Sequence, residues 1–280
     1  MEKLEMHRLI KEVFEACSGN VISEEIAMSP EVVGITMFEE PLVGVASASD
    51  VLFETYKEVG VIGPWFMRPE EWLSGAKTVI SLFFPFTEEV RASNRACVEG
   101  PSQAWVHSRV DGQGYLNAYM KQLKERVEAL GMRVCVPSID ARFGQVIAGN
   151  NRETYLFVTQ DTYGSNWSER HAAFACGLGT FGLSKGLITK KGMAGRFASI
   201  IIDREMQPDE RPYTDVYEYC TMCGACVKRC PVGAISLEGG KRHAPCDEWL
   251  KETKKQFAPR FGCGLCQTKV PCERKIPKKA

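Results

Sequence analysis

The chain has 280 residues and a mass of 31.2 kDa, with 44% apolar and 25% charged residues. This composition is typical of a soluble globular protein and excludes a disordered, collagen-like or coiled-coil chain. The 35 Lys and Arg residues balance the 35 Asp and Glu residues, so the whole chain lacks the basic excess expected of a protein that binds nucleic acid mainly through its phosphates. The apolar runs are too short to span a membrane, and the charged N-terminus predicts neither a secretion signal nor an anchor.

Apolar periodicity gives the elements of the first part of the chain. Helices are predicted over residues 2–17, 69–73, 114–130 and 168–176, and strands over 78–84, 132–137, 155–160 and 197–203. Residues 21–54 contain Pro30, Gly34, Pro41 and Gly44 and are expected to form loops. The predicted helices and strands alternate irregularly along the chain. This order favours an α+β fold, a sheet flanked by helices, over a doubly wound sheet.

The twelve cysteines are unevenly distributed, because eight of them lie between Cys220 and Cys272. Without an export signal, such a group predicts metal binding rather than a disulfide scaffold. Residues 213–280 carry 13 Lys and Arg against 7 Asp and Glu, a formal charge of +6, so residues 1–212 carry −6. We interpret the basic excess as compensation for anionic thiolates, with contact to RNA as the alternative. Pro208 and Pro212 mark the boundary between two predicted domains, residues 1–212 and 213–280.

The segment from Cys220 to Pro231 matches the spacing C-x2-C-x2-C-x3-C-P of bacterial ferredoxins. Zinc sites usually have their four ligands in two separate pairs, so a single run of four closely spaced cysteines argues against zinc. By the crossover rule of two-cluster ferredoxins, the fourth cysteine of the run joins the other cluster. We therefore predict two [4Fe–4S] clusters, one held by Cys220, Cys223, Cys226 and Cys272 and the other by Cys230, Cys246, Cys263 and Cys266.

The long spacings around Cys246 and Cys272 leave open whether these two cysteines are exchanged between the clusters. Either way each cluster has four thiolate ligands, so no iron is open to substrate. The clusters are predicted to transfer electrons to an acceptor in the first domain.

A glycine-rich segment is the strongest candidate for the acceptor site. Gly177, Gly179, Thr180 and Gly182 lie in a G-x-G-x-x-G pattern. A nicotinamide-binding loop of this kind follows a strand, whereas this segment follows a predicted helix. We favour a turn that brings the backbone close to a planar cofactor or substrate.

Three segments together resemble the epoxyqueuosine reductases, a family akin to the cobalamin-binding part of reductive dehalogenases. They are RPEEWLSGAKTVISL, NWSERHAAFACGLGTFGLSKGLIT and the eight-cysteine tail, which span roughly residues 65–275. The resemblance implies a nitroreductase-like domain that holds base-off cobalamin beside a two-cluster ferredoxin domain. It also implies a low-potential electron donor of the ferredoxin or flavodoxin type, and a substrate that is a small molecule or a modified nucleoside.

The resemblance also implies candidate residues. Cofactor-binding residues would be Ser168, His171, Gly177, Gly179, Thr180 and Gly182. The family's catalytic aspartate has two candidates, Asp161 and Asp140. Its chemistry needs a carboxylic acid whose pKa is raised by desolvation beside the cofactor, and Asp161 is preferred because it lies closer to the glycine turn.

Departures from the family pattern argue against tRNA as a substrate. The chain ends eight residues after Cys272, without the extension that grips tRNA, and Cys266-x5-Cys272 replaces the usual C-x3-C-P. Arg109, Tyr115, Arg170 and Cys176 are weaker site candidates, each with an ordinary structural role as the alternative.

Two alternatives to a cobalamin-dependent enzyme stay open. One is an electron-transfer protein that reduces a corrinoid protein or another partner and has no substrate of its own. The other is a flavin (FMN) reductase, because nitroreductase-like sheets also hold flavin. Low-potential clusters and free thiols lead us to expect the reducing cytoplasm.

Overall fold

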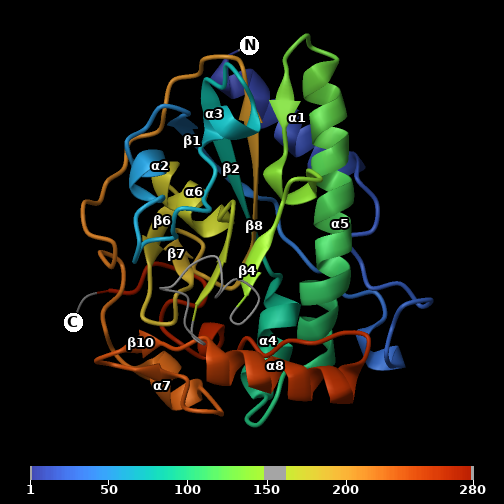
Figure 1. The fold of residues 1–280 in the computed structure, drawn as a ribbon. Helices are drawn as coiled ribbons and strands as arrows, with labels where there is room; N and C mark the ends of the chain where they lie inside the picture. Colours follow the sequence, from blue (N-terminus) through green and yellow to red (C-terminus); the bar gives the residue numbers. More distant parts are fainter. Residues whose placement is uncertain (1, 148–161, 279–280) are drawn as a thin grey trace.

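In the computed structural model, which describes residues 2–147 and 162–278, an antiparallel sheet runs through the centre (Figure 1). Its strand order is β1-β2-β8-β3. The strands are β1 (Leu42–Ser47), β2 (Thr78–Pro85), β8 (Gly195–Ile202) and β3 (Val134–Cys135). The two central strands pair along their full length, from Thr78 opposite Ile202 to Pro85 opposite Gly195.

Helices cover both faces of this sheet, which is why every residue of β2 is buried. Ile80, Leu82 and Phe84 face the layer of α1 (Lys3–Ala16) and α5 (Gln103–Glu128). The alternate residues Val79 and Phe83 face the layer of α2 (Leu52–Thr55) and α6 (Glu169–Ala175). Figure 1 shows α1 and α5 on one side of the sheet and α2 and α6 on the other. The predicted α+β class is confirmed.

The remaining elements are short. Between β1 and α6 these are α3 (Pro69–Trp72), α4 (Glu88–Ala96), β4 (Gln145–Ile147) and β5 (Tyr163–Ser165). A hairpin of β6 (Gly179–Phe181) and β7 (Leu187–Thr189) follows α6. The last elements are α7 (Ala225–Arg229), β9 (Ile235–Ser236), β10 (Gly240–Lys241) and α8 (Ala244–Phe257). Single 3-10 turns occupy Pro30–Val32, Pro137–Ile139 and Leu265–Gln267.

Two sequence predictions failed because of glycines. The loop expected over residues 21–54 contains β1, with Gly44 inside it. A Cβ on Gly44 would lie 2.3 Å from the Cys176 carbonyl oxygen, so this glycine lets the end of α6 approach the sheet. The helix predicted over 114–130 begins earlier, at Gln103, where Ser102 accepts a hydrogen bond from the Trp105 N–H. Gly112 in its middle lies against the Phe38 ring, 2.8 Å from a hypothetical Cβ.

The other predicted elements are found, with changed lengths. Helices α1, α3 and α6 lie where the periodicity placed them. The strand predicted over 132–137 has only two residues, Val134 and Cys135. The strand predicted over 155–160 lies outside the described residues.

The segment after β8 is bound to the first part of the chain. Asp209 pairs with β1, since its N–H donates to the Val45 carbonyl oxygen at 2.8 Å and its carboxylate accepts from the Val45 N–H at 2.9 Å. The Tyr213 hydroxyl donates to the Phe174 carbonyl oxygen of α6. The predicted boundary between residues 212 and 213 therefore falls within a segment that packs on the sheet layer.

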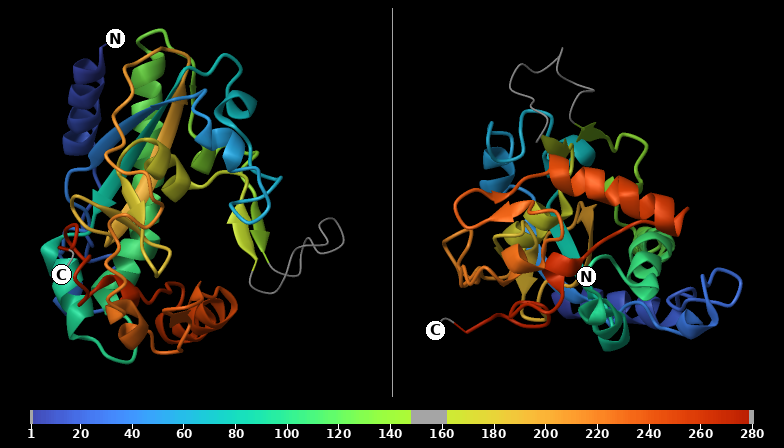
Figure 2. Two further views of the ribbon diagram at one scale, coloured as in Figure 1. Left: turned by 90° about the vertical axis from the view of Figure 1, so that its left-hand side faces the viewer. Right: turned by 90° about the horizontal axis from the view of Figure 1, so that it is seen from below.

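Residues 213–278, the cysteine-rich part, lie at one end of the sheet against α4 and α5 (Figure 2). The Asn94 amide donates to the Cys263 carbonyl oxygen at 3.2 Å and to the Thr268 hydroxyl at 3.1 Å. Gly264 adopts a φ of +67° and lies flat on Trp105, 1.9 Å from a hypothetical Cβ, so only glycine fits there. Among the described residues, no helix is both long and apolar enough to cross a bilayer.

Candidate metal centres and the adjoining cavity

The first group of cysteines lines a hollow between α7 and the β6–β7 hairpin. Its members are Cys220, Cys223, Cys226 and Cys272. Burial raises the pKa of Cys226 to about 11, with a further contribution from nearby thiols, Cys266 first among them, and raises that of Cys272 to about 12, with a further contribution from Cys220 and Cys226. Such mutual repulsion between thiolates disappears when they ligate a cation. The structure thus brings together the four cysteines that the crossover rule assigns to one cluster.

The second group lines a larger cavity next to the first. Its members are Cys230, Cys246, Cys263 and Cys266. Cys230 follows α7, Cys246 lies in α8, and the other two flank the start of the last 3-10 turn. Cys246 lies with this group and Cys272 with the first.

A [4Fe–4S] cluster and a single metal ion need different arrangements of cysteines. Among the residues that the structure describes, no three His, Cys, Asp or Glu side chains converge closely enough to hold one metal ion. A zinc ion needs its ligands around one point. In a [4Fe–4S] cubane each thiolate binds a different iron, so the four sulfur atoms stand further apart.

N–H groups point at the cysteines of the second group. The Ala234 backbone N–H donates to Cys230 Sγ at 3.2 Å. The Trp249 indole N–H makes no hydrogen bond of ordinary geometry, but it lies near enough to Cys263 Sγ to offset part of the burial that raises the pKa of Cys263 to about 11. Cluster sulfur atoms accept such bonds, which fits an iron–sulfur cluster in this group.

The cavity that the second group lines has a volume of about 300 Å³, which includes the space a cluster would take. Five cationic side chains from separate parts of the fold line it: Arg109, Arg170, Lys185, Arg196 and Lys241. None of its lining residues among those described is Asp or Glu. Sequence analysis identified Arg109 and Arg170 as weak candidates and missed the other three, because nothing in their local sequence indicates that they meet.

The predicted cofactor residues at the start of α6 do not line this cavity. Ser168 is the N-cap of α6, but its side chain does not cap the helix. Its hydroxyl instead hydrogen-bonds His171 Nδ1 at 2.7 Å. The imidazole packs against Tyr56 and Phe181 at ring distances of 5.0 and 4.8 Å. Burial lowers the pKa of His171 to about 3, so the ring is neutral near pH 7.

The protein chain itself fills the space in front of the predicted glycine turn. A Cβ on Gly179 would lie 1.9 Å from the Ile188 carbonyl oxygen of the same hairpin. Gly177 has a φ of +78° and lies against the Glu210 backbone. The Thr180 hydroxyl accepts a hydrogen bond from the Tyr219 N–H. These contacts with the protein itself explain why glycine is needed at positions 177 and 179. Gly182 borders the hollow of the first cysteine group.

Of the two aspartates predicted as the catalytic acid, Asp140 lies within the described residues. Asp140 accepts hydrogen bonds from Arg142 Nε and Nη2, both at 2.8 Å. Arg142 holds the pKa of Asp140 well below its usual range, so this residue lacks the raised pKa that the predicted acid requires. Asp161 lies outside the described residues. Tyr115 also lies away from the cavity, in the apolar core against Phe38.

Glu169 does have the raised pKa, and sequence analysis missed it. Both of its carboxyl oxygens are buried without a hydrogen-bond partner, near Ser199 and Trp167. Burial raises its pKa to about 7. A glutamate in the first turn of a helix normally faces solvent and stabilises the helix dipole, so no local pattern indicates this buried environment. Glu169 does not line the cavity, although its neighbour Arg170 does.

Replacing Glu169 with Gln should change the pH dependence of stability. The pKa of Glu169 rises from 4.5 in the unfolded chain to about 7 in the fold. Its favourable contribution is therefore complete below pH 4.5 and is lost as the pH rises through 7. Between pH 5 and 8 the wild type should lose roughly 3 kcal/mol relative to Glu169→Gln. Urea unfolding at each pH measures this, with exposed Glu24→Gln as the control; parallel curves for wild type and Glu169→Gln would contradict it.

Comparison with known proteins supports an iron–sulfur site in the cysteine-rich part. A model of the 4Fe-4S binding domain matches residues 213–236. The chain is 25% identical over 226 residues to an epoxyqueuosine reductase of Cyclobacterium marinum, an alignment that covers 74% of this chain and 62% of that protein. A tetrachloroethene reductive dehalogenase of Desulfitobacterium hafniense is 40% identical over 67 residues, which are 24% of this chain and 12% of that protein.

The fold is also similar to a solved structure. The epoxyqueuosine reductase of Streptococcus thermophilus superposes with a TM-score of 0.50 at 15% identity, covering 99% of this chain and 68% of that chain. The chain spans about three fifths of the length of the curated epoxyqueuosine reductases that it matches. The chain is thus similar to the epoxyqueuosine reductases in sequence and in fold, as the order of its motifs indicated.

Proposed function

We propose that the chain is an iron–sulfur reductase that passes electrons through two [4Fe–4S] clusters to an acceptor bound in the cationic cavity. The observation that carries this proposal is the arrangement of the eight cysteines. They line two neighbouring hollows, four in each, and the second hollow is the cationic cavity itself. The relatives are named as an epoxyqueuosine reductase and a reductive dehalogenase, which agrees with a reduction.

The exposure of the two groups suggests the direction of electron flow. Cys223 is exposed, and Met222 beside it is 42% exposed. A low-potential donor of the ferredoxin or flavodoxin type would deliver electrons at this surface. Cys226 and Cys266 of the two groups lie close enough to raise the pKa of Cys226. Electrons would then pass from the first cluster to the second, which borders the cavity.

The acceptor in the cavity would be cobalamin or, as the alternative, FMN. Trp105 and Trp249 form aromatic walls, and the five cations suit the phosphate that both cofactors carry. Bound there, cobalamin would supply a metal centre that takes up electrons from the neighbouring cluster. The chain's own residues would hold the cofactor against the second cluster and keep cations around it. A nitroreductase-like domain over residues 1–212 is part of the same proposal.

The substrate would be a small molecule or a modified nucleoside. This class rests on the relatives, which are named for epoxyqueuosine and for tetrachloroethene. The second candidate function is an electron carrier that reduces a corrinoid or another protein partner. The cavity favours the enzyme, since a carrier that exchanges electrons with a partner at its surface needs no ligand-binding cavity.

Spectroscopic titration tests the acceptor. Protein reconstituted with iron and sulfide without oxygen should show a broad cluster absorption, and cobalamin or FMN should shift its own spectrum on binding. We expect reduced clusters to be reoxidised by only one of the two cofactors. A cofactor that is reduced without turnover of any acceptor would favour the carrier. Clusters that reduce neither cofactor would contradict the proposed acceptor.

A further inference from the structure

The first group of cysteines reaches the surface through the loop that carries Cys223. Cys223 is exposed, and Met222 beside it is 42% exposed. Leu237 lies against the same loop, since a Cβ on Gly224 would lie 3.5 Å from Leu237 Cδ2, and it is 55% exposed. Scattered exposed apolar side chains are ordinary, but these two adjoin the exposed ligand of a redox centre. Met222 and Leu237 together are called the apolar rim below.

Another wall of the same hollow comes from the end of the chain. Val270, Pro271, Cys272 and Pro277 line it. Four exposed basic residues stand beside them: Lys269, Arg274, Lys275 and Lys278. Residues 269–278, called the basic segment below, therefore border the first group next to the loop of Cys223.

Little in the fold neutralises the basic segment. It has four basic residues and one acidic residue, a formal charge of +3. The acidic residue, Glu273, is buried and accepts a hydrogen bond from Arg95 Nη1 at 2.7 Å. None of the four basic side chains forms an ion pair with another residue in the part of the chain that the structure describes. The segment thus presents its positive charge to solvent.

Compensation of the anionic thiolates is a weak explanation for these exposed cations. Water and salt screen the charge of an exposed side chain, so it stabilises a neighbouring buried site little. The same charge acts through solvent on an approaching molecule and steers a protein of opposite charge. The basic segment is therefore better suited to attract an acidic partner.

The extent of the positive charge favours a protein over RNA. Carboxylates also flank the loop, because Asp215 and Glu218 precede Cys220 and Glu238 follows Leu237. They interrupt the extended basic face that RNA binding requires. Electron-transfer proteins form small complexes, of less than roughly 1,200 Å², in which an apolar contact has a polar or charged margin. The apolar rim beside the basic segment has this form.

We propose that the apolar rim and the basic segment form the docking surface for a small acidic electron-carrier protein. The carrier places its carboxylates against the basic segment, and the surface over its own redox centre against Met222 and Leu237. In each encounter the carrier loses one electron and the first cluster gains it, with no bond formed or broken. This inference rests on the proposed function and adds the recognition chemistry of its electron donor.

Stopped-flow reduction of cluster-loaded protein by flavodoxin hydroquinone, an acidic carrier, tests the role of charge. We expect the rate constant of the wild type to fall as NaCl is added. The double variant Arg274→Glu, Lys275→Glu should be reduced at least about tenfold more slowly at low salt. The two rates should converge in about 1 M NaCl, where charges are screened over about 3 Å.

The matched control is the double variant Lys121→Glu, Arg126→Glu. It makes the same change in net charge on exposed side chains of α5 that do not line the hollow. Flavodoxin should reduce it at close to the wild-type rate. Equal iron content in all variants, and an equal extent of reduction by excess dithionite, show that the clusters are intact.

A second arm tests the apolar rim. Leu237→Gln should slow reduction by flavodoxin several-fold at low and at high salt, because it removes apolar contact without changing charge. Leu130→Gln is the control, since Leu130 has the same exposure of 55% and does not line the hollow. Equal rates for these two variants would overturn the proposed docking surface.

Equal rates for the wild type and Arg274→Glu, Lys275→Glu at low salt would also overturn it. If that variant instead lost affinity for a single-stranded RNA, measured by fluorescence anisotropy, while flavodoxin reduced it normally, the basic segment would be an RNA site. Dithionite bypasses docking, so a failure of docking leaves the reoxidation of dithionite-reduced clusters by cobalamin or FMN intact. A failure of the reductase proposal leaves the salt-dependent reduction by flavodoxin intact.

Discussion

Cys272→Ala and Cys246→Ala should each remove about half of the iron, and double variants should reveal which cysteines share a cluster. Cys272 lies with the first group and Cys246 with the second. Cys223→Ala combined with Cys272→Ala removes two ligands of one cluster and should still leave about half of the iron. Cys223→Ala combined with Cys246→Ala damages both clusters and should leave almost none.

Iron and sulfide analysis after anaerobic reconstitution measures these losses, and electron paramagnetic resonance of the reduced protein counts the remaining clusters. Cys97→Ala is the matched control, because Cys97 is a half-buried free thiol outside both groups. It should retain all of the iron. If Cys223→Ala with Cys246→Ala kept half of the iron while Cys223→Ala with Cys272→Ala lost it, the two distant ligands would be exchanged. Full iron in every variant would refute the ligand assignment itself.

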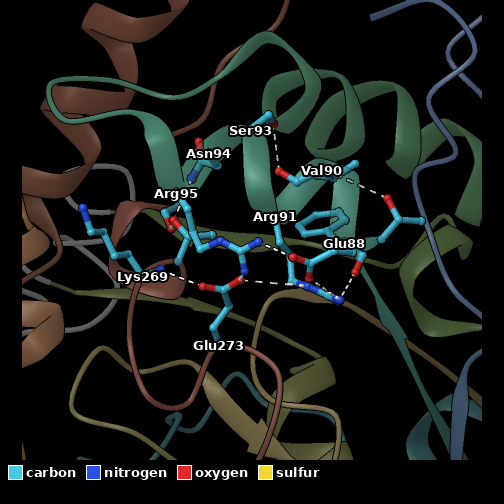
Figure 3. A network of polar contacts seen from close by, with 12 residues as sticks. Glu88, Val90, Arg91, Ser93, Asn94, Arg95, Lys269 and Glu273 are labelled. Atoms are coloured by element: carbon cyan, nitrogen blue, oxygen red, sulfur yellow. Dashed lines mark hydrogen bonds and ion pairs between the residues drawn. The ribbon is translucent and has the colours of Figure 1, made fainter.

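Glu273→Ala should destabilise the protein by roughly 3 kcal/mol. Glu273 directly follows Cys272 and is 5% exposed. Its carboxylate accepts a hydrogen bond from Arg95 Nη1 at 2.7 Å and another from the Lys269 backbone N–H at 2.7 Å, and lies 4.0 Å from Arg91 Nε (Figure 3). Alanine would leave two arginines facing a space without their shared counter-charge.

The expected loss in the free energy of unfolding is at the lower end of the range for breaking a buried ion pair, because Arg91 and Arg95 keep Glu88 as a partner. The change should also loosen the first cluster, since the Glu273 carboxylate accepts from the Lys269 N–H and from Arg95 and so ties the segment that carries Cys272 to α4. Urea unfolding and the rate of iron loss to a chelator measure the two effects. Glu238→Ala, an exposed change in the same part of the chain, is the control. Equal midpoints for the two variants would show that the network in Figure 3 contributes little.

Local spacing explains why the first cysteine run could be predicted. Cys220, Cys223 and Cys226 are three residues apart, so a short loop leading into α7 already holds three ligands on one side. Gly224 starts this turn with a φ of +70°. By contrast, Cys246 lies in α8 and Cys272 lies beyond the last 3-10 turn. Their separation in the chain fixes neither position, and the packing of the cysteine-rich part on α4 and α5 places them.

The failed predictions have one common physical origin, which is that tertiary contacts override local tendency. Gly44 suggested a loop, but it serves the close approach of α6 to the sheet, and Gly112, which lies before the predicted helix, is inside α5 against Phe38. The glycines around Gly179 suggested room for a cofactor, but the hairpin and the returning segment fill that room. Glu169 suggested a solvated helix start, but α6 turns it onto the sheet, where burial raises its pKa to about 7.

The sequence by itself determined the features that depend on neighbours a few residues apart: helices α1 and α6, the central strands β2 and β8, and the cysteine run. Only the tertiary structure decided which distant cysteine joins which group, and that Arg109, Arg170 and Arg196 face one cavity. The reason is physical. Periodicity and ligand spacing depend on the local geometry of the backbone. The shape of a cavity and its electrostatic potential depend instead on side chains that the fold brings together from distant parts of the chain.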